Sequence, residues 1–156
     1  MRHRSLHNLK VATVQQEDAH GCGVACLAMI AATTYPIARN TFQRLGFGVK
    51  RRNKPAFSSN FSELMSGLRE HGISCEMKRW RGWEHHPEDS LCILKVANGR
   101  KNSWHWVVTE PHSEFQVVVH DPDIAQLSYM KPPAGTSGWP FDAFEPFGYF
   151  IRILPG

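Results

Sequence analysis

The sequence has neither a recognisable signal peptide nor an apolar segment long enough to cross a membrane. Its N-terminus is basic, but residues 11–14 run directly into the polar stretch 15–18 and leave no apolar core for a signal peptide. The longest apolar run, residues 24–32, is far shorter than the roughly 20 residues that span a bilayer. We therefore expect a cytoplasmic protein, or one that a dedicated secretion system delivers into a target cell, with no membrane partner.

Cysteine is also sparse. The four cysteines are Cys22, Cys26, Cys75 and Cys92. They lack the paired spacing of a zinc knuckle, and a chain of 156 residues can bury a core without disulfides. We expect free thiols in a reducing compartment, with neither a metal nor a cofactor. Cys75 and Cys92 lie among apolar neighbours and are expected to be inert core thiols.

Excess charge is small, which argues against nucleic acid as a partner. The formal net charge is +4, and much of the positive charge gathers in residues 1–10 and 50–54. Runs of this kind are usually solvated loops. We expect residues 1–13 to form a basic arm and residues 14–156 to form one domain, and we do not expect nucleic acid to bind.

The first half of the domain has the pattern of helices. Three helices are predicted, one from Cys22, one over residues 40–45 and one after Asn60. The first is a buried helix that Tyr35-Pro36 is expected to end. Asn60 and Glu63 form a capping box at the start of the third. The stretch between the second and third helices, residues 46–59, is predicted to be a surface loop.

After Gly72 the periodicity changes to that of strands. The expected strands span residues 73–80, 91–96, 104–110, 114–120 and 148–154. The third and fourth are predicted to form a hairpin with its turn at residues 111–113. Helices first and strands afterwards predict an α+β fold, in which an N-terminal helical lobe packs on a C-terminal antiparallel sheet. A functional site is expected in the cleft between the two halves.

The segment around Cys22 carries the chemical signal. Cys22 lies at a predicted helix start, where free N–H groups and the helix dipole favour a thiolate and can stabilise an oxyanion. Gly21 and Gly23 flank the sulfur and leave room for a substrate main chain. Gln16 lies upstream, from where its amide could supply a second oxyanion donor. The same pattern also fits a tightly packed structural cysteine, so on its own it leaves both interpretations open.

A thiol nucleophile needs a base that later acts as an acid, which points to a histidine. Among nine histidines, His105 is distinguished by its place inside a strand, between Trp104 and Trp106, which are expected to be buried or to wall the cleft. A lone strand histidine is more often structural, but the presence of Cys22 favours a catalytic role.

The histidine ring must in turn be held by a carboxylate or an amide. Asp121 ends the next strand, and an antiparallel hairpin can bring that strand end beside His105. Asp before Pro122 is also typical of a turn start. Asp123 and Asn102 are weaker candidates for the same role.

Three motifs, in this order, resemble the double-glycine peptidases, a papain-like family that trims bacteriocin leader peptides. The motifs are Gln16 followed after five residues by Cys22-Gly23 opening an apolar helix, segment 104–108 reading WHWVV, and segment 117–122 reading VVVHDP. The resemblance runs from about residue 14 to the C-terminus. It departs from the family at Val24, where Pro or Ala is common, and in the absence of the transporter to which members are commonly fused.

The resemblance implies a cysteine peptidase. The implied roles are Cys22 as nucleophile, His105 as base and acid, Asp121 as orienting group and Gln16 as oxyanion donor. It also implies a peptide substrate with Gly-Gly before the scissile bond, because bulky walls admit only residues without side chains. Trp104, Trp106 and Trp139 are the candidate walls.

For the cellular role, a stand-alone member suggests a bacterial toxin. Such an antibacterial effector would cleave an intracellular protein of a competing cell, and the producing cell would need an immunity protein. Leader-peptide maturation is the alternative.

Three other interpretations stay open. A deamidase or acyltransferase could use the same residues through the same thioester. A zinc site could draw on His20, Cys22, Cys26 and His105. A catalytically silent binding domain could share the fold. Glu17 and Asp18 are expected to cap the helix start or to face solvent.

Overall fold

The computed structural model describes residues 8–97, 103–124, 127–135 and 140–156. The helices are α1 (Cys22–Ala31), α2 (Tyr35–Arg44) and α3 (Phe61–Glu70). The strands are β1 (Cys75–Arg79), β2 (Cys92–Ala97), β3 (Trp104–His112), β4 (Gln116–His120), β5 (Ser128–Tyr129) and β6 (Glu145–Ile153). Two short 3-10 turns, η2 (Trp83–His85) and η3 (Phe141–Ala143), complete the described elements. The predicted α+β fold, with its helical lobe and antiparallel sheet, is confirmed.

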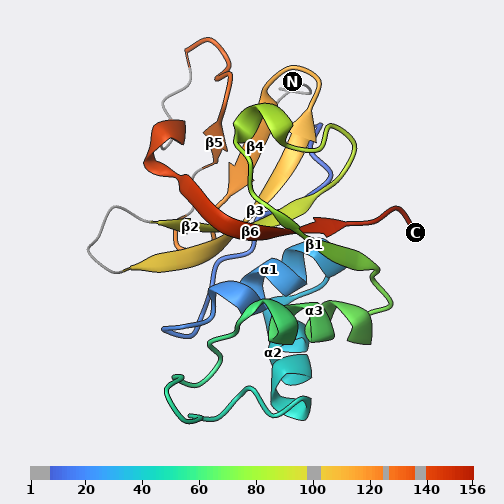
Figure 1. Cartoon of the computed structure of the whole chain (residues 1–156), viewed down its shortest axis with the longest axis vertical. Coiled ribbons are helices and arrows are strands. Elements are labelled where there is room, and N and C mark those ends of the chain that lie inside the picture. Colours follow the sequence, from blue (N-terminus) through green and yellow to red (C-terminus); the bar gives the residue numbers. More distant parts are fainter. Residues whose placement is uncertain (1–7, 98–102, 125–126, 136–139) are drawn as a thin grey trace.

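The six strands form one antiparallel sheet in the order β1-β6-β2-β3-β4-β5. Figure 1 shows the three helices together on one side of this sheet, with α1 next to it. Because side chains alternate along a strand, neighbouring residues face opposite sides of the sheet. In the register of β2, β3 and β6, Ile93 lies opposite both Val108 and Ile151, and all three face the helices.

Helix α1 is apolar on nearly all sides, and other elements therefore enclose it. Its residues from Gly23 to Met29 are buried, and it ends where Ala32 adopts a left-handed conformation with φ of 54°. The prediction that Tyr35-Pro36 ends this helix is wrong, because these residues begin α2. Thr34 caps α2, and proline is tolerated in a first turn because the N–H it lacks would have no helical partner.

Helix α3 begins as predicted. The Asn60 side chain accepts a hydrogen bond from the Glu63 N–H (2.8 Å), and the Glu63 carboxylate accepts one from the Asn60 N–H (3.0 Å). This reciprocal pair satisfies two N–H groups that a helix start would otherwise leave unpaired. The loop before α3 is therefore joined to it at a fixed angle.

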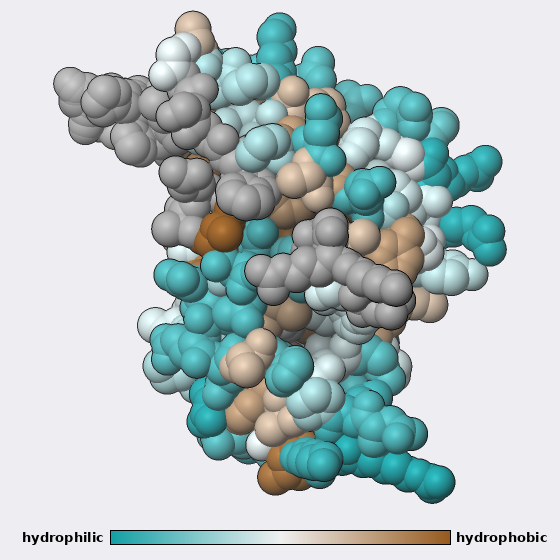
Figure 2. Space-filling model, turned by 90° about the vertical axis from the view of Figure 1, so that its left-hand side faces the viewer, coloured by the Kyte–Doolittle hydropathy of each residue, from teal (hydrophilic) through white to brown (hydrophobic). Residues whose placement is uncertain are grey.

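The sheet separates two apolar clusters. The larger one lies between the helices and the sheet and contains most of α1 together with Phe42, Leu64, Leu68 and Trp106. The smaller one lies on the other face and contains Leu94, Val107, Val119 and Phe150. On the face shown in Figure 2, hydrophilic residues cover most of the described surface, and apolar residues show only in separate patches.

The strands differ from the prediction mainly at their ends. Strand β3 continues through His112, so the hairpin turn lies at residues 113–115 and not at 111–113. The short strand β5 and both 3-10 turns were not predicted, because each is held by neighbouring segments and not by its own pattern. Among the described residues, no single helix is long and apolar enough to cross a membrane, although α1 and α2, bent by 114°, pass by length and composition as a pair.

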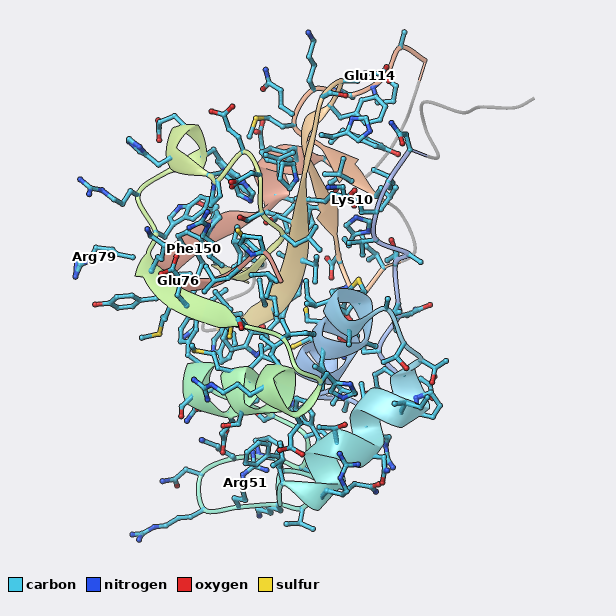
Figure 3. All side chains as sticks on the ribbon, turned by 90° about the vertical axis from the view of Figure 1, so that its right-hand side faces the viewer. Lys10, Arg51, Glu76, Arg79, Glu114 and Phe150 are labelled. Carbon is cyan, nitrogen blue, oxygen red and sulfur yellow. The ribbon has the colours of Figure 1, made fainter. Side chains whose placement is uncertain are left out.

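The N-terminal segment is held to the sheet by a buried acid. The Glu110 carboxylate accepts hydrogen bonds from the Lys10 and Val11 N–H groups and from His120 Nε2. The other ring nitrogen of His120 bonds to the Thr13 hydroxyl at 2.7 Å. Figure 3 shows Lys10 on the segment that runs beside the sheet. The domain boundary expected at residue 14 stays a prediction, yet these contacts tie residues 10–13 to the sheet.

The charge of Glu110 should contribute to stability. Burial alone would raise the pKa of this carboxyl, but the hydrogen bonds from His120, Lys10 and Val11 outweigh burial and hold it below 4.5. A lowered pKa stabilises the folded state above the unfolded-state pKa, and this contribution is lost as the pH falls through the folded-state value.

We predict that Glu110→Gln lowers the free energy of unfolding at pH 7 by about 2 kcal/mol or more, because an amide cannot accept all three hydrogen bonds. Urea unfolding followed by tryptophan fluorescence measures the change. The difference from the parent should begin to shrink as the pH is lowered below 4.5, where the unfolded chain becomes protonated at this carboxyl, and should be lost once the pH falls through the lower folded-state pKa. The exposed Glu114→Gln on the same hairpin is the matched control, and equal stability of both variants would contradict the role of Glu110.

Candidate active site

A cleft of about 510 Å³ opens between the helical lobe and the sheet. Its walls come from the segment before α1, the start of α1, the loop before α3 and the start of β3. The lining residues used below are Gln16, Cys22, Ser59, Trp104, His105 and Trp106. Helix α1 and strand β3 both begin at the left of Figure 1. A larger hollow of about 770 Å³, between residues 83–88 and the β3–β4 hairpin, contains no cysteine.

Cys22 is the first residue of α1, and its sulfur lies against the main chain of β3. The Trp106 N–H donates a hydrogen bond to Cys22 Sγ at 3.5 Å. The thiol is therefore next to the peptide group that joins His105 to Trp106. This contact brings together two residues that are 84 positions apart in the sequence.

Burial controls the protonation of Cys22 in the substrate-free protein. It raises the pKa of the thiol to about 11, and the N–H groups of Trp106, Gly23 and Cys22 lower it only in part. The helix start thus acts in the predicted direction, but the loss of water outweighs it. A thiolate at neutral pH consequently needs a base beside it to take the proton.

His105, which lines the cleft, forms a buried pair with Asp121. His105 Nε2 and Asp121 Oδ1 are 3.1 Å apart, and the His105 and Asp121 side chains are only 11% and 6% exposed. The same Asp121 oxygen accepts the Asp123 N–H at 2.9 Å. Asp121 therefore has both roles considered for it: it starts a turn, and it contacts the His105 ring. The other ring nitrogen, His105 Nδ1, is buried without a hydrogen-bond partner among the described residues.

Gln16 lines the cleft, but its amide is engaged. Its Nε2 donates to the carbonyl oxygens of Asp18 (3.1 Å) and Ala19 (3.2 Å), and its N–H donates to the Pro122 carbonyl (2.9 Å). The last bond ties the segment before α1 to the turn that contains Asp121. Use of Gln16 as an oxyanion donor would require its amide to leave one of the two carbonyls.

The sequence also matches a known protein family over most of its length. The model of the Peptidase C39 family matches residues 10–132. The chain belongs to this family. The expected cysteine peptidase is thereby confirmed, as is the resemblance to double-glycine peptidases. Among curated proteins, none matches the chain.

Two solved structures share the fold of this C39 peptidase. One is a double glycine motif protease from an AMS/PCAT transporter, in complex with the leader peptide. It has a TM-score of 0.60 at 21% identity, over 95% of this chain and 94% of that one. The other is the peptidase domain of Streptococcus ComA, a bi-functional ABC transporter involved in quorum sensing, with a TM-score of 0.62 at 19% identity, over 92% and 98%.

The two glycines beside Cys22 make room for the protein's own side chains. A Cβ on Gly21 would lie 2.0 Å from the Tyr35 hydroxyl, and a Cβ on Gly23 would lie 2.6 Å from Ser59 Oγ. Both glycines are buried. The space that the sequence suggested for a substrate is thus filled at these positions, and a direct role of either glycine in substrate binding stays a prediction.

The two tryptophans around His105 differ in exposure. Trp106 is 1% exposed and packs edge-on against Phe61, whereas Trp104 is 38% exposed. Both line the cleft, and their rings contact each other with centroids 5.3 Å apart. The third candidate wall, Trp139, lies outside the described residues, as does Asn102.

Sequence reasoning missed several residues that shape the site. Asp18 was expected to cap α1 or to face solvent. Its carboxylate instead pairs with Arg39 at 3.0 Å and accepts a hydrogen bond from the Tyr35 hydroxyl at 2.7 Å. Tyr35 and Arg39 lie on α2, and their spacing from Asp18 in the sequence gives no sign of this contact. Ser59 was placed in a solvated loop, but it is buried in the cleft.

The structure does not support the alternative zinc site among the residues that it describes. No group of three or more His, Cys, Asp or Glu side chains in that part of the chain could hold a metal ion. Cys26 is fully buried in the core beneath Cys22, and His20 is exposed at the rim of the cleft.

Proposed function

We propose that this C39 peptidase hydrolyses peptide bonds after Gly-Gly, with Cys22 as nucleophile, His105 as base and acid, and Asp121 as the orienting group. The observation that carries the proposal is the position of the Cys22 thiol. It lies against the main chain of His105-Trp106, at the floor of an open cleft. The histidine beside it is already held by a buried carboxylate through Nε2.

The geometry supports a definite proton path. His105 Nδ1 takes the proton of the Cys22 thiol, and Sγ attacks the carbonyl carbon of the scissile bond. The oxyanion then collapses, the C–N bond breaks, and His105 gives its proton to the leaving amine. A water molecule, deprotonated by His105, hydrolyses the thioester and restores the thiol. Asp121 keeps the ring oriented and stabilises its charged form.

Oxyanion stabilisation would come from the start of α1 and from Gln16. The Cys22 N–H belongs to the first turn of the helix, where it has no helical partner. The Gln16 amide reaches the same cleft and would exchange its bond to the Ala19 carbonyl for one to the oxyanion. We propose both groups as the donors.

A preference for Gly-Gly fits the shape of the cleft. The rings of Trp104 and Trp106 stand beside His105, and the space next to Gly23 is occupied by Ser59. A peptide bound beside these rings would meet them with any side chain next to the scissile bond, and glycine has none. A deamidase or acyltransferase would pass through the same thioester, but only hydrolysis of a peptide bond yields two fragments.

We predict that Cys22→Ala and His105→Ala each lower kcat by at least about 10³-fold on a synthetic peptide with a central Gly-Gly, because each removes a step of the thioester chemistry. Asp121→Asn should lower kcat less, since the ring keeps a hydrogen-bond partner. Separation of the fragments by liquid chromatography and mass spectrometry measures the rates.

The matched control for these variants is Cys75→Ala, which removes a free thiol on β1, away from the cleft. It should cleave at the parent rate. Parent-like cleavage by Cys22→Ala, or loss of activity only in Cys75→Ala, would contradict the assignment. Circular dichroism of each variant verifies that the fold is intact.

The cellular role is a separate proposal. We propose an antibacterial effector that acts on an intracellular protein of a competing cell, with an immunity protein as inhibitory partner. The support for this proposal is that Cys22 lines a cleft open to solvent, which a segment of a protein substrate could enter and an inhibitor could block. Maturation of a leader peptide is the alternative.

We predict that expression of the parent in a bacterium slows growth, and that expression of Cys22→Ala does not. The reason is that toxicity would require cleavage of a host protein. Growth curves with equal protein levels, followed by a search for new N-termini after Gly-Gly, measure the effect. Equal growth of both strains, with no new cleavage product, would favour the maturation enzyme.

A further inference from the structure

Ser59 carries a buried hydroxyl with no partner at the edge of the cleft. The residue is 4% exposed, and its Oγ makes no hydrogen bond among the described residues. It lines the cleft together with Cys22 and Trp106. A buried hydroxyl left without a hydrogen bond costs free energy, so its presence here requires an explanation.

The main chain on both sides of Ser59 is held in place. On one side, Arg51 donates hydrogen bonds to the Phe47 and Ser58 carbonyl oxygens, so that the loop is closed on itself. On the other side, Asn60 begins α3 through its capping box with Glu63. Figure 3 shows Arg51 on the loop at the end of the helical lobe. The main chain that carries the hydroxyl is therefore fixed at the cleft.

The basic run that the sequence placed in a solvated loop contributes to this rigidity. Lys54 and Arg51 lie 3.0 Å and 3.8 Å from the two carboxylate oxygens of Glu63. The Arg51 and Glu63 side chains are only 20% and 17% exposed. These two basic side chains are therefore engaged with α3 and its preceding loop.

Ser59 Oγ also lies close to the residue that follows the nucleophile. A Cβ on Gly23 would be 2.6 Å from Ser59 Oγ and 3.3 Å from Cδ1 of Trp106. The hydroxyl therefore stands between the first turn of α1 and the tryptophan that follows His105. Ser59 and Cys22 line the same cleft, so a peptide bound at the Cys22 thiol would lie in the cleft that Ser59 lines.

We propose that Ser59 is a substrate-binding residue whose hydroxyl hydrogen-bonds to the main chain of the peptide next to the scissile bond. This inference rests on the proposed peptidase function. Two consecutive glycines offer no side-chain atoms, so only their N–H and C=O groups can be recognised by hydrogen bonds. A serine hydroxyl can donate to the carbonyl or accept from the amide.

The kinetic signature of such a contact differs from that of an oxyanion donor. A hydrogen bond to the main chain is present in the bound substrate and in the transition state alike. Its loss therefore raises KM and leaves kcat nearly unchanged. Loss of an oxyanion donor would instead lower kcat.

The test compares Ser59→Ala with Ser62→Ala, which removes a hydroxyl from an exposed position on α3. We expect Ser59→Ala to raise KM for the Gly-Gly peptide about fivefold to tenfold, with kcat within twofold of the parent. In the Cys22→Ala background, isothermal titration calorimetry with the same peptide should show an equal rise in Kd. Ser62→Ala should change neither quantity.

Thermal unfolding of the free protein separates binding from a structural role. Because the hydroxyl bonds to none of the described residues in the substrate-free protein, its removal should leave Tm unchanged or raise it. A hydroxyl needed for folding would give a lower Tm. A fall in Tm, a Kd within twofold of the parent, or a fall in kcat at constant KM would each overturn the proposal.

The experiment also distinguishes this inference from the function on which it rests. If the Cys22→Ala protein binds the peptide and Ser59→Ala binds it equally well, only the role of Ser59 is refuted. If the Cys22→Ala protein does not bind the peptide and the parent does not cleave it, the proposed Gly-Gly peptidase function fails, and the inference fails with it.

Discussion

The site depends on the packing of helix α1 against strand β3. The helix is enclosed on nearly all sides, and its N-terminal residue lies on the main chain that carries the histidine. Within the core that joins the helical lobe to the sheet, this contact is the one at the place where the chemistry is proposed to occur. It also determines the electrostatics, because the burial that holds Cys22 in place raises the pKa of its thiol to about 11. As the proposed nucleophile, Cys22 would therefore depend on a base, and His105 on β3 is the residue proposed for that role.

A second set of contacts fixes the positions of the proposed catalytic side chains relative to each other. Asp121 receives both the His105 ring and the Asp123 N–H, and the neighbouring Pro122 carbonyl binds the Gln16 N–H. One residue earlier, His120 is tied to Glu110 and so to the N-terminal segment. The end of β4 thus connects the segment before Cys22 with Asp121, the proposed orienting carboxylate. The position of His105 thus depends on Asp121, a neighbour that is itself buried and hydrogen-bonded.

Much of this arrangement could be predicted from the sequence, because its signals are local. The start of α1 at Cys22, the capping box at Asn60 and the order of helices and strands all follow from short-range patterns. Tyr35-Pro36 misled the prediction, because proline is compatible with a helix start as well as with a helix end. For the same reason the second helix was predicted to be too short, over residues 40–45, whereas α2 begins at Tyr35.

The parts that could not be predicted depend on contacts between distant residues. The thiol pKa depends on how deeply Cys22 is buried, which the helix dipole argument does not include. Tyr35 fills the space at Gly21, and Ser59 fills the space at Gly23. In both cases a glycine that suggested an open approach marks a tight contact. The clasp between Glu110 and His120 likewise joins two adjacent strands whose register the sequence does not reveal.

The most direct test of the central claim is covalent labelling with a peptide chloromethyl ketone that ends in Gly-Gly. Such a reagent reports the nucleophile, the base and the recognition of glycine together. Peptide mapping by mass spectrometry should find one label, on Cys22, with none on Cys26, Cys75 or Cys92 and a strongly reduced rate in His105→Ala. Labelling of another cysteine at an equal rate, or a rate at Cys22 that is unchanged in His105→Ala, would contradict the account.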